Sequence, residues 1–267
     1  MNKFPTLLLL CSLSIFAYAD YDSALAAYDA GDYETAFKEF LPLAEAGDAK
    51  VQHILGVMYE NGFGVQQSYA EAVKWYRKAA EQGYVYAQYN LGIMYYTGLG
   101  VQQDYAKAVK WYRKAAEQGY VYAQYNIGIM YHQGLGVSQN FAKAINWYRK
   151  AAEQEVTDAQ YNLGDMYLKG LGVTQDYAEA IMWYRKAAEQ GHALAQSNVG
   201  FMYYSGFGVP KDYVKAFAWV DIAAASGHKP AQKARNMIGA KLNATQLKEA
   251  RKLAKELREK YGNKTKN

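Results

Sequence analysis

The stretch KWYRKAAEQGYVYAQYN occupies residues 74–90 and recurs without change at residues 110–126. All five tryptophans of the chain follow one another at intervals of 36 residues: Trp75, Trp111, Trp147, Trp183 and Trp219. Pairs of glycines keep the same period, from Gly62 and Gly64 to Gly206 and Gly208. A fixed period of this length indicates a protein built from repeated supersecondary units. We divide the chain into five repeats, at residues 48–83, 84–119, 120–155, 156–191 and 192–227.

Each repeat is predicted to form two helices, and the second repeat shows why. The pattern favours a first helix over residues 85–96 and a second over residues 104–118, joined by TGLGVQQ. Asp104 can cap the second helix, and Gly119 can end it in a left-handed conformation. The second helix places its apolar residues on one face: Tyr105, Ala108, Val109, Trp111, Tyr112, Ala115 and Ala116. No single repeat can bury that face alone, so the repeats should stack as antiparallel helix pairs in an all-α superhelical solenoid.

These motifs closely resemble the Sel-one-like repeat (SLR), a relative of the tetratricopeptide repeat. In the second repeat the resemblance rests on AQYNLG at 87–92, GLGV at 98–101, DY at 104–105 and WYRKAA at 111–116. It covers about residues 48–227 and implies a right-handed superhelical solenoid whose first helices line the concave side. The chain departs from the repeat pattern at two places. Glu155 replaces a helix-ending glycine, and Asp221 with its neighbours replaces the Tyr-Arg-Lys run that follows the tryptophan. Members of this family commonly act as adaptors, and exported bacterial members are often tied to envelope function or host contact.

The ends of the repeat array have the character of caps. Residues 20–47 resemble a shortened helix pair without the glycine loop. After the fifth repeat, capping helices are expected over residues 229–240 and 244–261, within a capping segment 228–262. The charged face of the last helix suits a terminal repeat, which must be soluble on its outer side. Residues 263–267 are expected to form a disordered tail.

Residues 1–19 have the pattern of a secretory signal peptide. Lys3 supplies the positive charge, residues 7–16 form an apolar run, and Ala17 and Ala19 fit the cleavage pattern. A membrane span needs about 20 apolar residues, twice this run. A lipoprotein is disfavoured because Leu10 precedes Cys11. We therefore expect cleavage after Ala19 and an exported protein, either periplasmic or secreted.

Composition and motifs disfavour several classes of function. The chain has 51% hydrophobic and 21% charged residues, which is typical of a globular protein. Its net charge of +5 is too mild to indicate nucleic-acid binding, and a single cysteine excludes a disulfide framework or a cysteine-based zinc site. The four histidines lack metal-ligand spacing, and no phosphate-binding or nucleophile motif occurs. We predict no metal, no cofactor and no enzymatic activity.

The candidate binding residues are those that differ between repeats, because packing positions must recur. On the first helices, four such positions lie within an arc of about 80°. Across the second to fourth repeats the candidates are Tyr86, Tyr89, Ile93, Tyr96, Tyr122, Tyr125, Ile129, His132, Asp158, Tyr161 and Asp165. They predict a tyrosine-rich concave groove with an acidic spot, where a protein or peptide partner would bind. The alternative is that some of these tyrosines only pack between neighbouring first helices. We expect the protein to be a monomer.

Two other functions stay open at this point. The protein could bind an envelope carbohydrate or peptidoglycan. A hydrolase could use Asp158 and Asp165, since paired carboxylates can cleave glycosidic bonds. The second helices also carry a basic stripe, such as Lys107, Lys110 and Lys114. That stripe is interpreted as a solvated face with local ion pairs, or as a site for an anionic partner.

Processing at the N-terminus gives the first prediction. The exported protein should begin at Asp20, because alanines at 17 and 19 fit the signal peptidase pocket. N-terminal sequencing of the exported form measures this. An exported form that still contains Lys3 would contradict the prediction.

Overall fold

A computed structural model describes residues 21–261, and the predicted signal peptide and tail lie outside the described residues. Helical residues 21–29 precede α2 (Tyr33–Glu45). The first helices of the five repeats are α3 (Ala49–Asn61), α5 (Val85–Thr97), α7 (Val121–Gln133), α9 (Thr157–Lys169) and α11 (Ala193–Ser205). The second helices are α4 (Tyr69–Glu81), α6 (Tyr105–Glu117), α8 (Phe141–Glu153), α10 (Tyr177–Glu189) and α12 (Tyr213–Ala225). The chain then ends in α13 (Lys229–Gly239) and α14 (Ala244–Tyr261).

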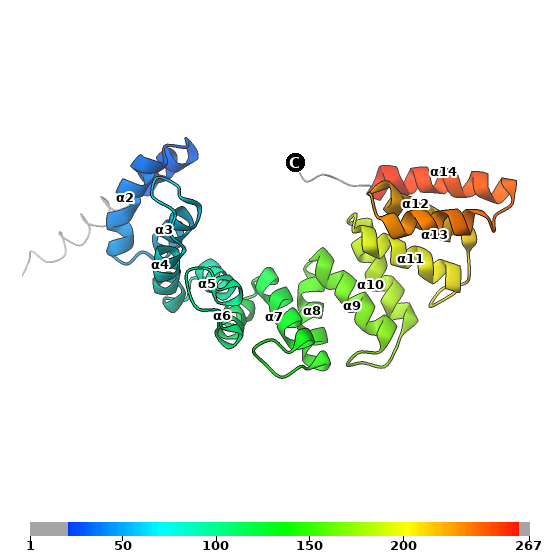
Figure 1. Cartoon of the computed structure of the whole chain (residues 1–267), viewed down its shortest axis with the longest axis horizontal. Coiled ribbons are helices and arrows are strands. Elements are labelled where there is room, and N and C mark those ends of the chain that lie inside the picture. The colour runs from blue at the N-terminus through cyan, green and yellow to red at the C-terminus, as the bar shows by residue number, and fades with distance from the viewer. Residues whose placement is uncertain (1–20, 262–267) are drawn as a thin grey trace, which may run out of the picture. The chain divides into compact units, whose positions relative to one another are not determined.

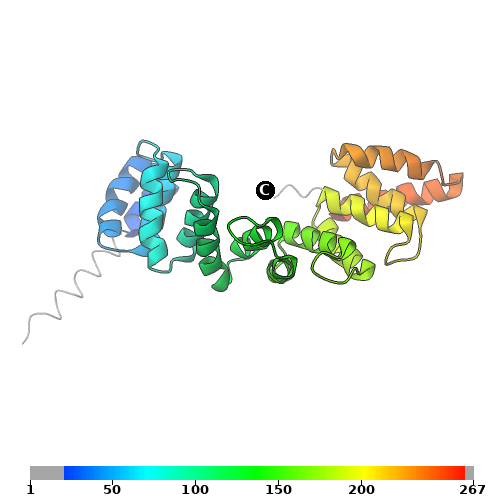
Figure 2. The same cartoon turned by 60° about the horizontal axis from the view of Figure 1, so that its bottom comes forward.

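The helices pack as consecutive antiparallel pairs, which confirms the predicted all-α solenoid fold (Figures 1 and 2). Two compact units divide the chain. The first runs to Ala123 and includes residues 135–137, and the second contains residues 124–134 and the chain from Ser138 onward. Within the first unit each of α2 to α5 contacts the next helix along the chain. In the second unit the same holds from α8 to α12, and α12 also contacts α13 and α14.

A glycine–tyrosine contact joins the two helices of four of the repeats. Gly92 in α5 lies against the ring of Tyr112 in α6, and a Cβ on this glycine would stand 2.6 Å from two ring carbons. That approach is closer than van der Waals contact allows, so only glycine fits there. The other pairs are Gly56 with Tyr76, Gly128 with Tyr148, and Gly164 with Tyr184. In the fifth repeat Gly200 faces Val220 instead.

In the first, second, fourth and fifth repeats, a buried glutamine donates to a carbonyl of the preceding helix. Gln88 in α5 donates from Nε2 to the carbonyl of Ala80 at 3.2 Å and accepts from Gln118 Nε2 at 2.8 Å. The buried polar residues of the described chain are all at this position: Gln52, Gln88, Gln124, Gln160 and Gln196. Buried amides are stable when both ends are hydrogen-bonded. The last repeat differs, because Ser226 stands where glutamine is expected and Gln196 Oε1 has no partner within residues 21–261.

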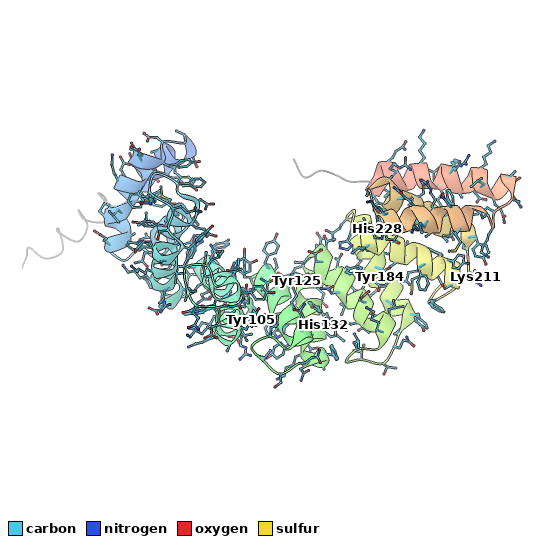
Figure 3. All side chains as sticks on the ribbon, viewed as in Figure 1. Tyr105, Tyr125, His132, Tyr184, Lys211 and His228 are labelled. Atoms are coloured by element: carbon cyan, nitrogen blue, oxygen red, sulfur yellow. The ribbon has the colours of Figure 1, made fainter. Side chains whose placement is uncertain are left out.

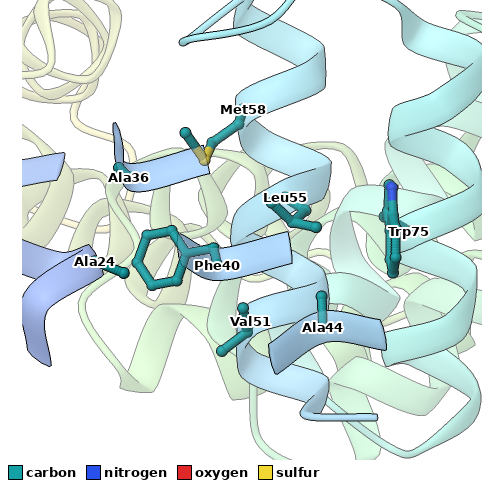
Figure 4. Close-up of a cluster of buried hydrophobic side chains, with 8 residues drawn as sticks. All are labelled: Ala24, Ala36, Phe40, Ala44, Val51, Leu55, Met58 and Trp75. Atoms are coloured by element: carbon teal, nitrogen blue, oxygen red, sulfur yellow. The ribbon is translucent and has the colours of Figure 1, made fainter. Parts of the chain in front are cut away.

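The N-terminal pair covers the first repeat with its own hydrophobic core (Figure 4). Phe40 in α2 is fully buried and packs with Leu55 and Met58 of α3. Its ring also lies 5.9 Å from that of Tyr21. The segment 21–45 therefore caps the apolar face that the first repeat would otherwise expose to water.

The turns confirm the sequence-based assignments in detail. Asp104 caps α6 by accepting from the Lys107 amide at 2.9 Å. Glu155, which replaces a helix-ending glycine, still adopts a left-handed conformation with φ 64°. It is the one non-glycine residue in the described chain with a positive φ. Within residues 21–261, none of the helices has both the length and the apolar character needed to cross a bilayer.

Gly100 marks a close approach between successive repeats. Its φ is +68°, and a Cβ there would lie 2.2 Å from the carbonyl oxygen of Tyr69 in the preceding repeat. Gly119 has a similar φ of +91° but no heavy atom within 4 Å of the added Cβ. A substitution at Gly119 therefore tests the effect of the positive φ alone, whereas one at Gly100 tests the positive φ together with a steric clash.

Substituting these two glycines tests the contact. Gly119→Val should reduce the free energy of unfolding by about 1 kcal/mol, because a branched residue resists positive φ. Gly100→Val should cost up to about 3 kcal/mol, because the same strain is joined by a backbone clash. Urea unfolding followed by circular dichroism measures both. Equal losses would show that the repeats do not depend on the close approach at Gly100.

Candidate functional site

Five tyrosines form an aromatic surface in the first unit. We call Tyr84, Tyr86, Tyr89, Tyr120 and Tyr122 the tyrosine surface. Tyr86 and Tyr122 each lie one residue into their helix, α5 and α7, and are 47% and 52% exposed. Large hydrophobic residues with this exposure are few in the described chain. These two rings are therefore accessible to a partner.

The rings of the tyrosine surface contact one another in an unbroken series. Tyr84 lies 5.5 Å from Tyr86, and Tyr86 lies 5.5 Å from Tyr120, measured between ring centroids. Tyr120 then lies 4.9 Å from Tyr89 and 5.7 Å from Tyr122. Tilted and edge-to-face contacts at such distances are favourable for aromatic side chains. Each exposed ring thus contacts at least one neighbouring ring.

His53 of α3 lies beside this surface and is half-buried. Its ring centroid is 5.3 Å from that of Tyr84 and 6.1 Å from that of Tyr86. Its Nε2 lies 3.1 Å from Asn90 Nδ2, an amide nitrogen that can only donate. An unprotonated Nε2 can accept from this amide, and burial lowers the pKa of His53 to about 4, which favours the neutral imidazole at pH 7.

Three predicted residues of the second repeat lie in different surroundings. Tyr89 belongs to the tyrosine surface, and its ring also lies 5.8 Å from that of Tyr112. Ile93 is half-buried on α5. Tyr96 turns to the loop side, where its ring lies 5.4 Å from that of Tyr105 in α6. Tyr96 therefore packs against the second helix of its own repeat, not against a neighbouring first helix.

Tyr125 and His132 of α7 lie in the second unit, where Figure 3 labels both. The hydroxyl of Tyr125 accepts from Asn162 Nδ2 at 3.4 Å, its ring lies 5.9 Å from that of Tyr148, and burial raises its pKa. His132 packs on Phe141 at 5.5 Å, and burial lowers its pKa. Ile129, between them on α7, is half-buried. These side chains take part in helix packing more than the tyrosine surface does.

The acidic spot predicted in the fourth repeat is compensated by its neighbours. Asp165 accepts from the Tyr184 hydroxyl at 2.5 Å and pairs with Lys169 at 2.5 Å. Asp158 lies 3.4 Å from Nε2 of His192. Tyr161 stacks on His192 with ring centroids 4.7 Å apart. The two carboxylates thus have partners within the fold and are not a free anionic patch.

The same contacts bear on the hydrolase hypothesis. A general acid in glycoside hydrolysis needs a raised pKa so that it carries a proton at neutral pH. The hydrogen bond from His192 instead lowers the pKa of Asp158. Asp158 is held as a carboxylate, which is the opposite of what the acid role requires. Within residues 21–261, no group of three or more His, Cys, Asp or Glu side chains could hold a metal ion.

The basic stripe of the second helices is largely engaged within its own helices. Lys107 pairs with Asp104 at 3.1 Å. Lys114 places its ammonium 4.7 Å from the Trp111 ring centre, and Lys78 stands 3.9 Å from that of Trp75. Such cation–π contacts and local ion pairs are typical of a solvated helix face. The stripe agrees with the solvated interpretation.

Sequence reasoning missed three residues that lie just before a first helix. Tyr84, Tyr120 and His192 hold equivalent positions in three repeats, and each makes ring contacts with candidate residues. They precede the predicted first helices by one residue, so the variable positions within those helices do not include them. The signal was available, because Asp48 and Val156 occupy the same position elsewhere.

Comparison with known proteins identifies the repeat. The family model described as Sel1 repeat matches five times, at residues 49–84, 85–120, 121–156, 157–192 and 193–228. Among solved structures, a Sel1 repeat protein from Oxalobacter formigenes has 32% identity, covers 88% of this chain and 96% of its own, and gives a TM-score of 0.74. A protective antigen with an SLR fold, present in uropathogenic Escherichia coli strains, has 29% identity, covers 94% and 78%, and gives a TM-score of 0.47. The sequence matches no protein of curated function.

The half-buried His53 predicts a specific loss of stability in acid. In the unfolded chain its pKa is about 6.5, and in the folded protein it is about 4. Its contribution is therefore complete above pH 6.5 and is lost as the pH falls toward 4, by at most about 3 kcal/mol. The second to fourth repeats carry tyrosine at this position, so His53→Tyr is a matched variant. Urea unfolding at pH 7 and pH 4.5 should show a smaller difference for the variant, and an unchanged difference would contradict the burial of a neutral imidazole.

Proposed function

Because the chain belongs to the Sel1 repeat family, we propose that it is a non-enzymatic scaffold that binds a protein or peptide partner on its tyrosine surface. The observation that carries this proposal is the exposure of Tyr86 and Tyr122 within a series of contacting rings. Single exposed aromatic side chains are common on proteins, but a group of exposed apolar side chains marks an interaction site, because covering it removes apolar area from water. The partner would supply that cover.

The geometry suits recognition by ring contacts. Tyrosine offers a large contact area, loses little side-chain entropy on binding and keeps a hydroxyl for hydrogen bonding. Tyr86 and Tyr122 recur at the same place in successive repeats, so they offer two similar anchor points. Each of the two rings contacts a neighbouring ring, which limits the entropy lost on binding. An extended segment with apolar side chains at intervals fits this arrangement.

The packing residues contrast with the tyrosine surface. Gln88 and Gly92 recur in every repeat because they make the internal contacts described above. The position of Tyr86 instead holds Asp158 in the fourth repeat and Leu194 in the fifth. Since the fold accepts tyrosine, aspartate or leucine there, packing does not require an exposed tyrosine at 86 or 122. A binding role accounts for the choice.

The proposed location is outside the cytoplasm. Residues 1–19 combine a positive charge, a short apolar run and a small-residue cleavage pattern, as exported proteins do. The protein would act in the periplasm or after secretion, where its partner would belong to the envelope or to the surroundings of the cell. The absence of cysteine beyond Cys11 would leave the exported chain free of disulfides.

Binding measurements on matched variants test the proposal. A partner isolated from an envelope extract with the full mature protein should bind Tyr86→Ala and Tyr122→Ala about 1–3 kcal/mol more weakly than wild type, because aromatic anchors dominate such interfaces. Lys110→Ala, an exposed change on the second helix of the same repeat, should cost well under that. Isothermal calorimetry measures the affinities, and circular dichroism checks that the variants fold.

Three outcomes would contradict the proposal. Equal losses from the tyrosine and lysine variants would show that Tyr86 and Tyr122 are not the anchors. A loss from Lys110→Ala alone would place the site on the second helices. Release of the partner by free envelope glycan would show that carbohydrate, not protein, is bound.

A further inference from the structure

We propose that the C-terminal cap carries a second binding site, a pocket for the carboxylate of a ligand with an apolar group. The pocket lies between α12, α13 and α14 and has a volume of about 490 Å³. Its lining residues are Phe217, Asp221, Arg235, Asn236, Gly239, Leu247 and Arg251. The volume falls in the range typical of small-ligand pockets, about 300–1,000 Å³.

The wall of the pocket on α12 includes Asp221, one of the positions at which the fifth repeat departs from the others. Asp221 stands where the second and third repeats carry Arg113 and Arg149, and the first carries Arg77. Arg77 donates to the Tyr95 hydroxyl of the following repeat at 2.7 Å. The fifth repeat is followed by α13 and α14, and its aspartate, which replaces the arginine, contacts these two helices instead.

Asp221 joins the two capping helices to the last repeat. Its Oδ1 accepts from Arg235 of α13 at 3.3 Å, and its Oδ2 accepts from Arg258 of α14 at 2.6 Å. The Asp221 side chain is only 15% exposed, so both ion pairs are partly shielded from water. These bonds fix α13 and α14 on α12 and therefore fix the walls of the pocket.

Arg251 is a charged residue of the pocket wall that has no ion-pair partner within residues 21–261. It lines the pocket from α14, and no acidic side chain within residues 21–261 pairs with it. Its neighbours one turn away along α14 are Leu247 and Lys255, neither of which carries a negative charge. The charges lining the pocket are then two arginines against one aspartate, a net of one positive charge.

The chemistry of the lining selects a monoanion with an apolar group. A guanidinium presents a planar fork of donors that matches a carboxylate, and one net positive charge balances one carboxylate better than a doubly charged phosphate. Asn236 adds an amide that can donate to the same group. Phe217 and Leu247 supply an apolar wall next to these donors. A small organic acid and the free C-terminus of a peptide ending in an apolar residue share this chemistry.

Titration of the full mature protein with paired probes tests the site. N-acetylphenylalanine should bind with a dissociation constant of about 1 mM or tighter, and its amide should not bind in that range, because only the acid carries the charge. A pentapeptide ending in phenylalanine is compared with its C-terminal amide in the same way. Tighter binding of the free-acid peptide than of N-acetylphenylalanine identifies a peptide C-terminus as the source, and equal binding identifies a small acid.

Variants assign the binding to Arg251. Arg251→Gln should weaken the binding of both free acids about tenfold or more, because it removes a charge-assisted hydrogen bond. Lys252→Gln, at the next residue and exposed, should have little effect. Arg251 is exposed and unpaired, so the fold should be unaffected, as circular dichroism can verify. No saturable binding of either acid, equal binding of inorganic phosphate, equal binding of the amides, or an unchanged affinity in Arg251→Gln would each overturn the proposal.

Discussion

The contact between a glycine of the first helix and a tyrosine ring of the second sets how closely the two helices pack in the first four repeats. The ring lies where a Cβ would be, so the two helices approach more closely than other residues would allow. Tyr184 is fully buried, yet its hydroxyl reaches Asp165 on the first helix of the same repeat. Burial, followed by this carboxylate, raises the pKa of the Tyr184 phenol well above its usual range. In the fourth repeat, a tyrosine of the packing core therefore contacts a candidate binding residue on the first helix directly.

The repeats use that face differently while keeping the core unchanged. In the first unit the face carries contacting tyrosines, two of which are about half exposed. In the fourth repeat it carries Asp158 and Asp165, each engaged by a neighbouring side chain. A scaffold with a constant interior and a variable face can be adapted to a partner one repeat at a time, because each repeat contacts only its neighbours. The proposed binding site therefore lies in the first unit, where the aromatic side chains are both grouped and accessible.

The sequence predicted the helices closely because periodicity, caps and turn glycines all agree. The helix expected over residues 85–96 runs from Val85 to Thr97, and the one expected over 244–261 has those bounds. Exposure was harder to predict, since it depends on the next repeat. Tyr125 meets Asn162, a residue 37 positions further along the chain, and Asp165 meets Tyr184 in another helix. The C-terminal pocket was not foreseen, because it depends on three helices brought together by Asp221.

We propose that a partner covers the tyrosine surface and leaves the second helices exposed. Site-specific photo-crosslinking tests it most directly. A benzophenone amino acid placed at residue 86 or 122 of the exported protein should yield one discrete crosslinked product in cells, while the same group at residue 110 should yield none. A discrete product from residue 110 with none from residues 86 and 122 would contradict the account.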